Sequence, residues 1–451
     1  MQIRYILLLF MLLGIFLPIT GSLLDISTYH FPIILVISIT SWILFTYPSR
    51  NIFLSKDLVR FLSALLIFLS IQSVTGRGFV ILSGGGYVII IAAFFYMIFC
   101  QANIKINDLV SLFSLVYLIL IIFLLLEFLM LSLGYQPLLV KIFNSIQAPG
   151  YKNYNPADLL QKIGLFAGTQ NQREIGGLNS IFLGSQIAGM VSLFALIWFG
   201  YIKSITRSIT IHKIYSNNYI VIISAIFLLV TFNATVSLLV LLAIFVYGNF
   251  IKIENRLIKN IFFILLFLIF ALLIVEGLLF SRITSDSFKM YDQEAEFYRV
   301  YGLVDQIKSM SRLEFYAWSF FRPVDLWLTI DLQDQLLGSG KYFFLNDKIF
   351  LSGDFGFGAD VLLKCGLLWA LVYIWYSLKI CLRALRACRR VNLNTLSWQG
   401  LGAITGLVSL LWLASTIHYA QAFQNPGCVI FYAMNFATTI FSIRQSSLKP
   451  K

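Results

Sequence analysis

Charged residues are scarce in this sequence. Asp, Glu, Lys and Arg make up 12% of the 451 residues, whereas 59% of the residues are hydrophobic and the mean hydropathy is +0.86. Soluble domains contain roughly 25% charged residues. This composition therefore excludes a soluble globular protein, and no stretch of the chain has the composition of an appended soluble domain.

Cysteine and histidine are also few. All five cysteines lie in or beside hydrophobic runs, so no disulfide framework is expected in the polar loops. The cysteines and the three histidines show no spacing typical of a metal site. The polar loops also lack the Asp-x-Asp pair with which nucleotide-sugar enzymes hold divalent ions. We therefore expect no metal and no other cofactor.

The net charge of +13 does not by itself indicate nucleic acid. In membrane proteins, Lys and Arg gather in cytoplasmic loops because they set the orientation of the spans. We therefore expect no nucleic-acid partner.

Long apolar runs recur along the whole chain, which predicts an all-α polytopic integral membrane protein. The first run resembles a signal peptide, but its cleavage site is poor, and we interpret it as an anchor. The stretch from Tyr219 to Phe250 is too long for one untilted helix, so we divide it near Phe232–Thr235 into a tight helical hairpin. About twelve transmembrane helices are expected: 5–20, 31–47, 61–75, 78–99, 109–132, 178–202, 218–232, 235–250, 258–280, 360–382, 399–417 and 427–443.

Two long polar segments divide these spans into groups. The expected organisation is 1–132 with helices one to five, 133–177 as a first long loop, 178–280 with helices six to nine, 281–358 as a large loop with short amphipathic helices, and 359–451 with helices ten to twelve and a tail.

The distribution of basic residues predicts the orientation. With the N-terminus inside, every inner connection carries Lys or Arg, whereas the short outer connections carry little beyond Arg77. Both termini are then cytoplasmic and both long loops face the periplasm of a bacterial inner membrane. Because the periplasm contains no ATP or nucleotide sugars, a reaction there needs an activated substrate delivered through the membrane.

The large loop contains a candidate anion site. Ser311-Arg312-Leu313-Glu314 has the pattern of a capping box, and a short helix should follow and end before Pro323. Arg312 would then lie beside the free N–H groups of the first turn, which favours an anion. The alternative is that Arg312 contacts lipid phosphates.

Several short patches occur in a characteristic order along the chain. They are Arg173–Asn179, Gly184–Gln186, Arg312 with Trp318, Leu336–Gly340, Asp354–Gly356 and Leu362–Leu367. Their layout resembles that of the Wzy-type O-antigen and polysaccharide polymerases and of the related O-antigen ligases, a GT-C-like glycosyltransferase layout. The chain departs from these families at Ser237, which is followed by Leu238 where an arginine is frequent. The large loop also has no histidine, which favours a polymerase over a ligase.

The resemblance implies a metal-independent reaction. A growing glycan would move from undecaprenyl pyrophosphate to a lipid-linked repeat unit, with membrane lipids and a chain-length regulator protein as further partners. Arginines would stabilise the leaving pyrophosphate and a carboxylate would act as general base. The residues implied are Asp354 as the base, Arg173, Arg312, Arg282 and Arg322 for pyrophosphate, Tyr316 and Trp318 for sugar rings, and Gly338 and Gly340 for a turn.

Two other functions remain open from the sequence. A ligase that transfers glycan to lipid A core would use the same donor with a different acceptor. A lipid-linked oligosaccharide flippase would have a similar number of spans, but transporters usually place polar groups at the midplane of the membrane. The spans here are nearly free of charge at mid-depth, which favours an outward-facing enzyme.

Overall fold

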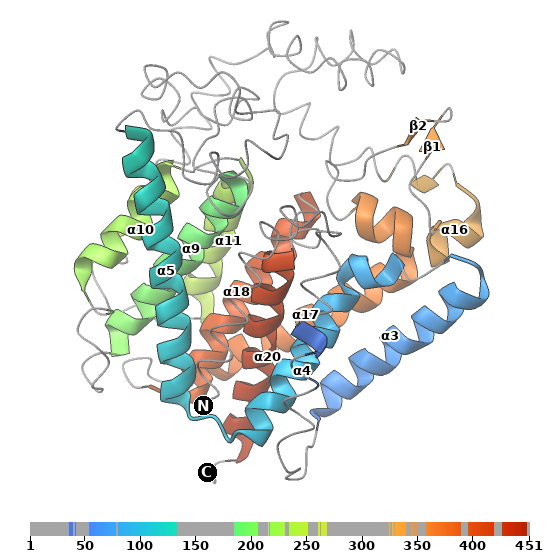
Figure 1. Cartoon of the computed structure of the whole chain (residues 1–451), viewed down its shortest axis with the longest axis horizontal. Helices are drawn as coiled ribbons and strands as arrows, with labels where there is room; N and C mark the ends of the chain where they lie inside the picture. The colour runs from blue at the N-terminus through green and yellow to red at the C-terminus, as the bar shows by residue number, and fades with distance from the viewer. Residues whose placement is uncertain are drawn as a thin grey trace, which may run out of the picture.

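The computed structural model shows a bundle of long helices (Figure 1). It describes residues 36–38, 41, 54–77, 80–132, 185–205, 215, 217–230, 234–250, 260–261, 263–267, 324, 327–328, 330–339, 344–345, 348–349, 358–388, 396–418 and 426–448. Its longer elements are α3 (Lys56–Val74), α4 (Tyr87–Gln101), α5 (Ile106–Ser132), α9 (Ser185–Ile205), α10 (Asn218–Val230), α11 (Ala234–Phe250), α17 (Leu367–Cys388), α18 (Trp398–His418) and α20 (Pro426–Leu448). Its short elements are η1 (Leu82–Gly86), α16 (Leu332–Leu337), β1 (Phe344–Leu345), β2 (Lys348–Ile349) and η7 (Gly358–Leu363).

The protein is a helical multi-pass membrane protein. Within the described ranges, six helical segments are long and apolar enough to cross a membrane: 56–74, 84–101, 106–126, 188–205, 367–388 and 398–416. The described residues are otherwise helical or irregular, apart from the two-residue antiparallel pair of β1 and β2. The expected helical class is therefore confirmed for the described chain, with this short hairpin as an addition.

Local capping sets the ends of α3. The Ser55 hydroxyl accepts a hydrogen bond from the Leu58 N–H at 3.2 Å, and Asp57 follows in the first turn, where a negative charge stabilises a helix. The helix ends at Val74 with Thr75 as its C-cap, and Gly76 then adopts a positive φ of 70°, which glycine tolerates best. The helix begins five residues before the expected span of 61–75.

The segment expected as one helix over 78–99 is broken near its start. Gly84 and Gly85 lie outside helical geometry, with a φ of +100° at Gly85. A Cβ on Gly85 would lie 2.5 Å from the ring of Tyr373, so this backbone passes closer to α17 than another residue would allow. The hydropathy pattern does not reveal this break, because Gly84–Gly86 lie within an otherwise apolar run.

The segment expected as one helix over 360–382 is broken in the same way. It divides into η7 and α17 at Gly366, which has a φ of +85°. The two broken segments, η1 and η7, contact each other. The expected spans 109–132, 178–202, 399–417 and 427–443 correspond to α5, α9, α18 and α20 where they are described, and the division of Tyr219–Phe250 into α10 and α11 is confirmed. The expected span 5–20 lies outside the described residues, and most of 31–47 and 258–280 does as well.

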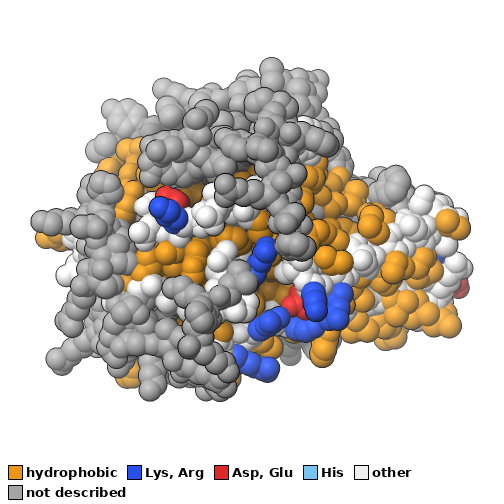
Figure 2. Space-filling model, turned by 90° about the horizontal axis from the view of Figure 1, so that it is seen from below, with side chains coloured by type: hydrophobic (Ala, Val, Ile, Leu, Met, Phe, Trp, Pro, Cys, Tyr) orange, Lys and Arg blue, Asp and Glu red, His pale blue; other side chains and the backbone are white. Residues whose placement is uncertain are grey.

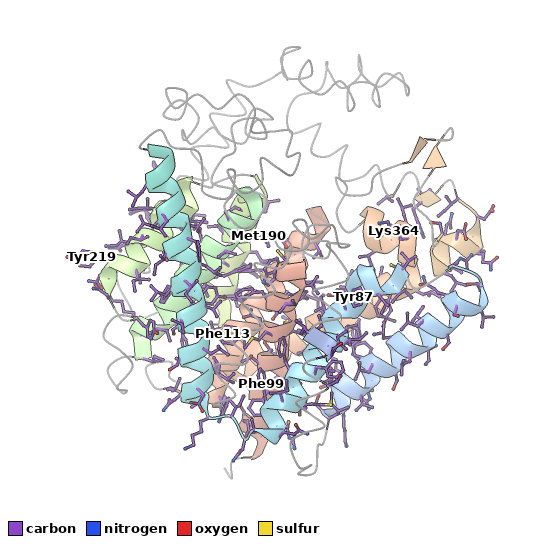
Figure 3. All side chains as sticks on the ribbon, in the orientation of Figure 1. Tyr87, Phe99, Phe113, Met190, Tyr219 and Lys364 are labelled. Carbon is purple, nitrogen blue, oxygen red and sulfur yellow. The ribbon has the colours of Figure 1, made fainter. Side chains whose placement is uncertain are left out.

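Side chains fill the space between the helices (Figure 3), and the largest fully buried ones are aromatic. On α18, Gly402 allows close approach of α20, because a Cβ at this position would lie 2.9 Å from Ser442. Gly406 allows close approach of α17, because a Cβ there would lie 3.2 Å from Ala384. Between α5 and α9, the buried Trp198 indole donates a hydrogen bond to the Ser114 hydroxyl at 3.0 Å. Helices α4, α5, α9, α17, α18 and α20 pack against one another as one unit.

Charge is distributed unevenly between the two ends of the bundle. At the first turn of α3, Asp57 pairs with Lys379 at 3.4 Å and with Arg383 at 2.9 Å. Arg444 on α20 donates to the Tyr96 hydroxyl at 3.1 Å near the last turn of α4. Figure 2 shows Lys and Arg side chains gathered on this face of the bundle. The opposite end, where α3 finishes and α4 is broken, carries the site described next.

Candidate functional site

A turn of the large polar loop packs against the break in a membrane helix, and the two backbones are in direct contact. We call this contact, formed by Leu336–Ser339 against Leu363–Gly366, the junction. Ser339 donates its backbone N–H to the Leu363 carbonyl at 2.9 Å. Gly338 and Gly366 both have positive φ, and a Cβ on either would lie closer than 3.0 Å to backbone atoms of the other segment. Only glycine fits at these two positions.

Gln72 ties three chain segments together beside the junction. Its side chain is 1% exposed, and its amide nitrogen donates to the Leu337 carbonyl at 3.3 Å. Its amide oxygen accepts from the Ile81 N–H at 3.2 Å, at the start of the broken segment before α4. A buried backbone group without a partner costs about 1–3 kcal/mol. This one side chain therefore holds α3, α16 and the break near η1 in register.

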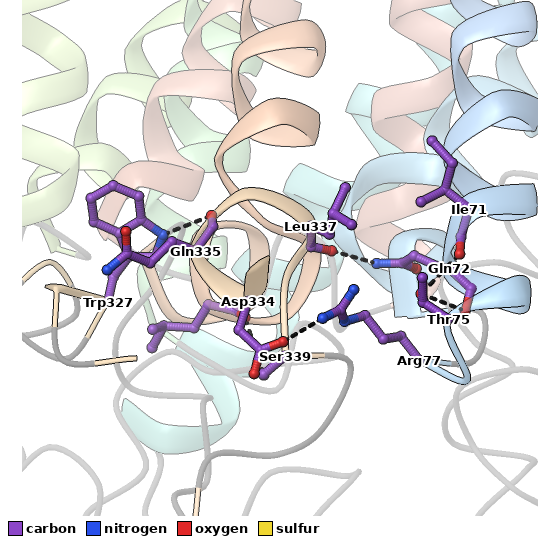
Figure 4. Close-up of polar contacts among 10 residues, drawn as sticks. Ile71, Gln72, Thr75, Arg77, Trp327, Asp334, Gln335, Leu337 and Ser339 are labelled. Atoms are coloured by element: carbon purple, nitrogen blue, oxygen red, sulfur yellow. Dashed lines mark hydrogen bonds and ion pairs between the residues drawn. The ribbon is translucent and has the colours of Figure 1, made fainter. Parts of the chain in front are cut away.

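Arg77 pairs with Asp334 of α16 at the same place (Figure 4). The Nη2 atom of Arg77 lies 2.5 Å from Oδ1 of Asp334, and the two side chains are 10% and 35% exposed. The other terminal nitrogen, Nη1, is buried and has no hydrogen-bond partner among the described residues. The backbone N–H of Arg77 donates to the Gln72 carbonyl at 2.9 Å, and this hydrogen bond fixes the position of the Arg77 backbone.

Further hydrogen bonds hold α16 and the helices beneath it. The Trp327 indole donates to the Gln335 carbonyl at 2.9 Å, and the Gln335 amide donates to the Ile330 carbonyl at 2.9 Å. Below the junction, the buried Trp369 indole donates to the Gly84 carbonyl at 2.9 Å, which satisfies a backbone group freed by the break. Lys364 lies in the last turn before Gly366, at the same end of the bundle (Figure 3).

The structure joins two patches that the sequence presents separately. Leu336–Gly338 and Leu362–Leu367 were both part of the resemblance in layout, and they meet in the junction. Gly338, predicted to shape a turn, lies at the end of α16 with a φ of 86°. The other predicted site residues lie outside the described residues: Asp354, Arg173, Arg312, Arg282, Arg322, Tyr316, Trp318 and Gly340.

Sequence reasoning did not identify Gln72 or Arg77 as site residues. Gln72 is a single amide in the apolar run Leu65–Val74, and Arg77 is the basic residue that stands out in a short outer connection. Both are signals, because polar groups inside or at the end of a span carry a cost that a partner must offset. What the sequence does not contain is the partner, which lies more than 250 residues further along the chain.

The arrangement offers hydrogen-bond donors to an anion more readily than ligands to a metal. Within the described residues, no group of three or more His, Cys, Asp or Glu side chains is placed to hold a metal ion. The chemical feature of the site is an arginine fork with one arm on a carboxylate and one arm buried without a described partner. Guanidinium groups of this kind bind phosphate oxygens well.

We predict that Gly338→Ala destabilises the protein far more than Gly76→Ala. Both glycines have positive φ, but a Cβ on Gly76 has no atom within 4 Å, whereas a Cβ on Gly338 meets the backbone of Lys364. The left-handed backbone alone costs roughly 1–2 kcal/mol. Thermal unfolding in detergent should therefore show a small shift for Gly76→Ala and at least twice that shift for Gly338→Ala. Equal shifts would mean that the junction contributes little.

We predict that Gln72→Leu loses about 2–6 kcal/mol of stability, because two buried backbone groups lose their partner at about 1–3 kcal/mol each. Ser70→Ala is the matched control on the same helix, since the Ser70 hydroxyl is exposed and bonds only within α3. Thermal unfolding of both variants measures the difference. A Gln72→Leu protein that unfolds with the Ser70→Ala control contradicts the role assigned to the amide.

Comparison with known proteins adds no relative to this picture. No protein-family model, no curated protein and no solved structure matches the chain. The likeness to polysaccharide polymerases therefore rests on the layout and the short patches, and the site rests on its own geometry.

Proposed function

We propose that this protein is a polysaccharide polymerase of the bacterial inner membrane. It transfers a growing glycan from undecaprenyl pyrophosphate to a lipid-linked repeat unit, and the site faces the periplasm. The observation that carries the proposal is the junction, where a turn of the largest polar loop is seated on the broken end of a membrane-length helix. Such a seat holds polar groups at the depth where a lipid pyrophosphate lies.

The reaction needs residue types that the two long polar loops contain. The leaving pyrophosphate gains charge as the glycosidic bond breaks, so it needs cations at the membrane surface. Arg173 and Arg312 are the first candidates for that role, and Arg282 and Arg322 are further loop arginines in the sequence. The acceptor hydroxyl needs a base, and Asp354 is four residues before the start of η7 in the sequence.

The positions of the two helix breaks favour an enzyme over a flippase. Transporters place broken helices at the midplane, where the substrate binds. Here Gly366 is followed by a helix of 22 residues, which is long enough to cross the membrane without the broken part. The break before α4 is followed by 15 helical residues, which is shorter than a full span, so this break lies deeper than Gly366 but still nearer to the end of the bundle that carries the junction. Breaks nearer to one end than to the midplane favour a reaction at the membrane surface.

The phenotype of a deletion strain separates the three candidate functions. For a polymerase, we expect surface glycan that stops at one repeat unit. Loss of all surface glycan with accumulation of lipid-linked polymer would instead identify a ligase. Single lipid-linked units that accumulate on the cytoplasmic side would identify a flippase.

The orientation follows from the charge distribution and can be measured. Because Lys and Arg favour the cytoplasmic side, the end of the bundle that carries Lys379, Arg383 and Arg444 should face the cytoplasm. Single cysteines at Ser287 and Gly353 should then react with a membrane-impermeant thiol reagent in cells whose inner membrane is intact. Labelling that requires permeabilised inner membranes would reverse the orientation.

We predict that Arg173→Ala and Arg312→Ala each lower polymerisation by at least about tenfold while the protein still inserts and accumulates. A charge-assisted hydrogen bond contributes about 1.5–3 kcal/mol, and about 1.4 kcal/mol corresponds to a factor of ten in rate. Lysine should restore only part of the rate, because it keeps the charge without the fork. Asp354→Asn should abolish turnover and leave donor binding intact. The measurement is polymer length and rate with purified protein and lipid-linked substrate.

Arg299→Ala is the control for these variants. Arg299 follows a helical pattern that places it on the polar face of an amphipathic segment, so its loss should change the rate little. Greater sensitivity at Arg299 than at Arg173 and Arg312, or normal polymerisation by Asp354→Asn, would put the site elsewhere.

A further inference from the structure

The guanidinium of Arg77 has hydrogen-bonding capacity that the fold does not use. Its Nη2 atom is on Asp334, and its backbone N–H is on the Gln72 carbonyl. Its Nη1 atom is buried and has no partner among the described residues. A hydrogen bond to a charged group is stronger than one between neutral groups, and a buried charged donor without a partner carries an energetic penalty. Fold stability alone therefore does not account for an arginine at this position.

We propose that Arg77 binds the pyrophosphate of the lipid-linked donor, with Asp334 holding the guanidinium in place. This inference rests on the proposed function, because it assigns another residue to the donor site of that reaction. Arg77 is three residues beyond the end of α3, a membrane-length helix, and so belongs at the depth of lipid headgroups. It also lies directly beside the junction, which seats the large loop.

The ion pair with Asp334 selects for a multiply charged ligand. Arg77 and Asp334 together have no net charge, so a phospholipid headgroup with one negative charge gains little attraction from the pair. A pyrophosphate carries more negative charge and several acceptor oxygens, so it competes better for the fork. Access is from the Asp334 side, because Asp334 is 35% exposed whereas Arg77 is 10% exposed.

The alternative role for Arg77 is to clamp α16 to α3. A clamp and a ligand site make opposite demands on Asp334. If Arg77 is only a clamp, removal of either partner breaks the same contact and the two variants behave alike. If Arg77 binds pyrophosphate, removal of the Arg77 side chain loses the ligand, whereas removal of the Asp334 charge frees the arginine for it.

The test compares Arg77→Gln with Asp334→Asn in the purified full-length protein. The probe is farnesyl pyrophosphate, with farnesol and phosphatidylglycerol as the arms that lack the pyrophosphate. We expect Arg77→Gln to weaken farnesyl pyrophosphate binding at least about tenfold, and Arg77→Lys to weaken it less. We expect Asp334→Asn to bind farnesyl pyrophosphate as tightly as the wild type or more tightly, because the Asn side-chain oxygen can still accept from Nη2 and orient the fork, whereas the competing negative charge is lost. Thermal unfolding of each variant monitors the fold.

Three results would overturn the inference. Equal losses of binding in Arg77→Gln and Asp334→Asn would identify a clamp. Equal dependence of phosphatidylglycerol binding on Arg77 would identify a general lipid contact. Unchanged farnesyl pyrophosphate binding by a folded Arg77→Gln protein would remove Arg77 from the site. Because Asp334→Asn has its own expected outcome, the inference stays testable if Arg77→Gln does not fold.

A polymerisation assay on the same proteins separates this inference from the proposed function. If wild-type protein polymerises and Arg77→Gln does so with an unchanged KM for the donor, the inference fails and the polymerase stands. If wild-type protein makes no polymer with its lipid-linked substrate, but farnesyl pyrophosphate binding depends on Arg77, the polymerase fails and the pyrophosphate site stands.

Discussion

The crossing of two backbones at Gly338 and Gly366 is the constraint on which this end of the molecule depends. Each glycine occupies a position where a Cβ would collide with the other segment, so the two segments can approach only if both residues lack side chains. The close approach lets the Ser339 N–H reach the Leu363 carbonyl. A polar loop is thereby fixed on a membrane helix by its backbone, and the contact does not depend on a matched pair of side chains at that point.

This contact requires a broken helix, and a broken helix near lipid creates its own demand. Backbone groups freed by a break have no water in the hydrocarbon region and must find partners within the protein. The Trp369 indole donates a hydrogen bond to the Gly84 carbonyl. The Gln72 side chain accepts one from the Ile81 N–H and donates one to the Leu337 carbonyl. The glycines and the buried polar side chains therefore have complementary roles. The glycines allow the helices to break, and the polar side chains form hydrogen bonds with the backbone groups that the breaks leave without helical partners.

The sequence predicts the helices of this protein better than it predicts the site. Long apolar runs are a local signal, and α5, α9, α10, α11 and α18 lie close to the expected ranges. The breaks at Gly85 and Gly366 were missed because average hydropathy hardly changes across a short glycine-containing turn. The Leu337 carbonyl that accepts from Gln72 and the Asp334 carboxylate that pairs with Arg77 lie in a different part of the chain, and no local pattern connects residues separated by more than 250 positions.

Arg77 is exceptional both in the charge distribution of the sequence and in its contacts in the structure. The charge rule treats a basic residue in a short outer connection as an exception, because it places the Lys and Arg of the short inner connections at the other end of the bundle. The structure shows this exception buried, oriented by a carboxylate from the large loop, and joined through Gln72 to the segments that form the junction. An arginine that only snorkelled to the interface would need none of these contacts. The contacts fix the orientation of the fork relative to the loop, and a fixed fork loses less side-chain entropy when a ligand binds than a mobile one does.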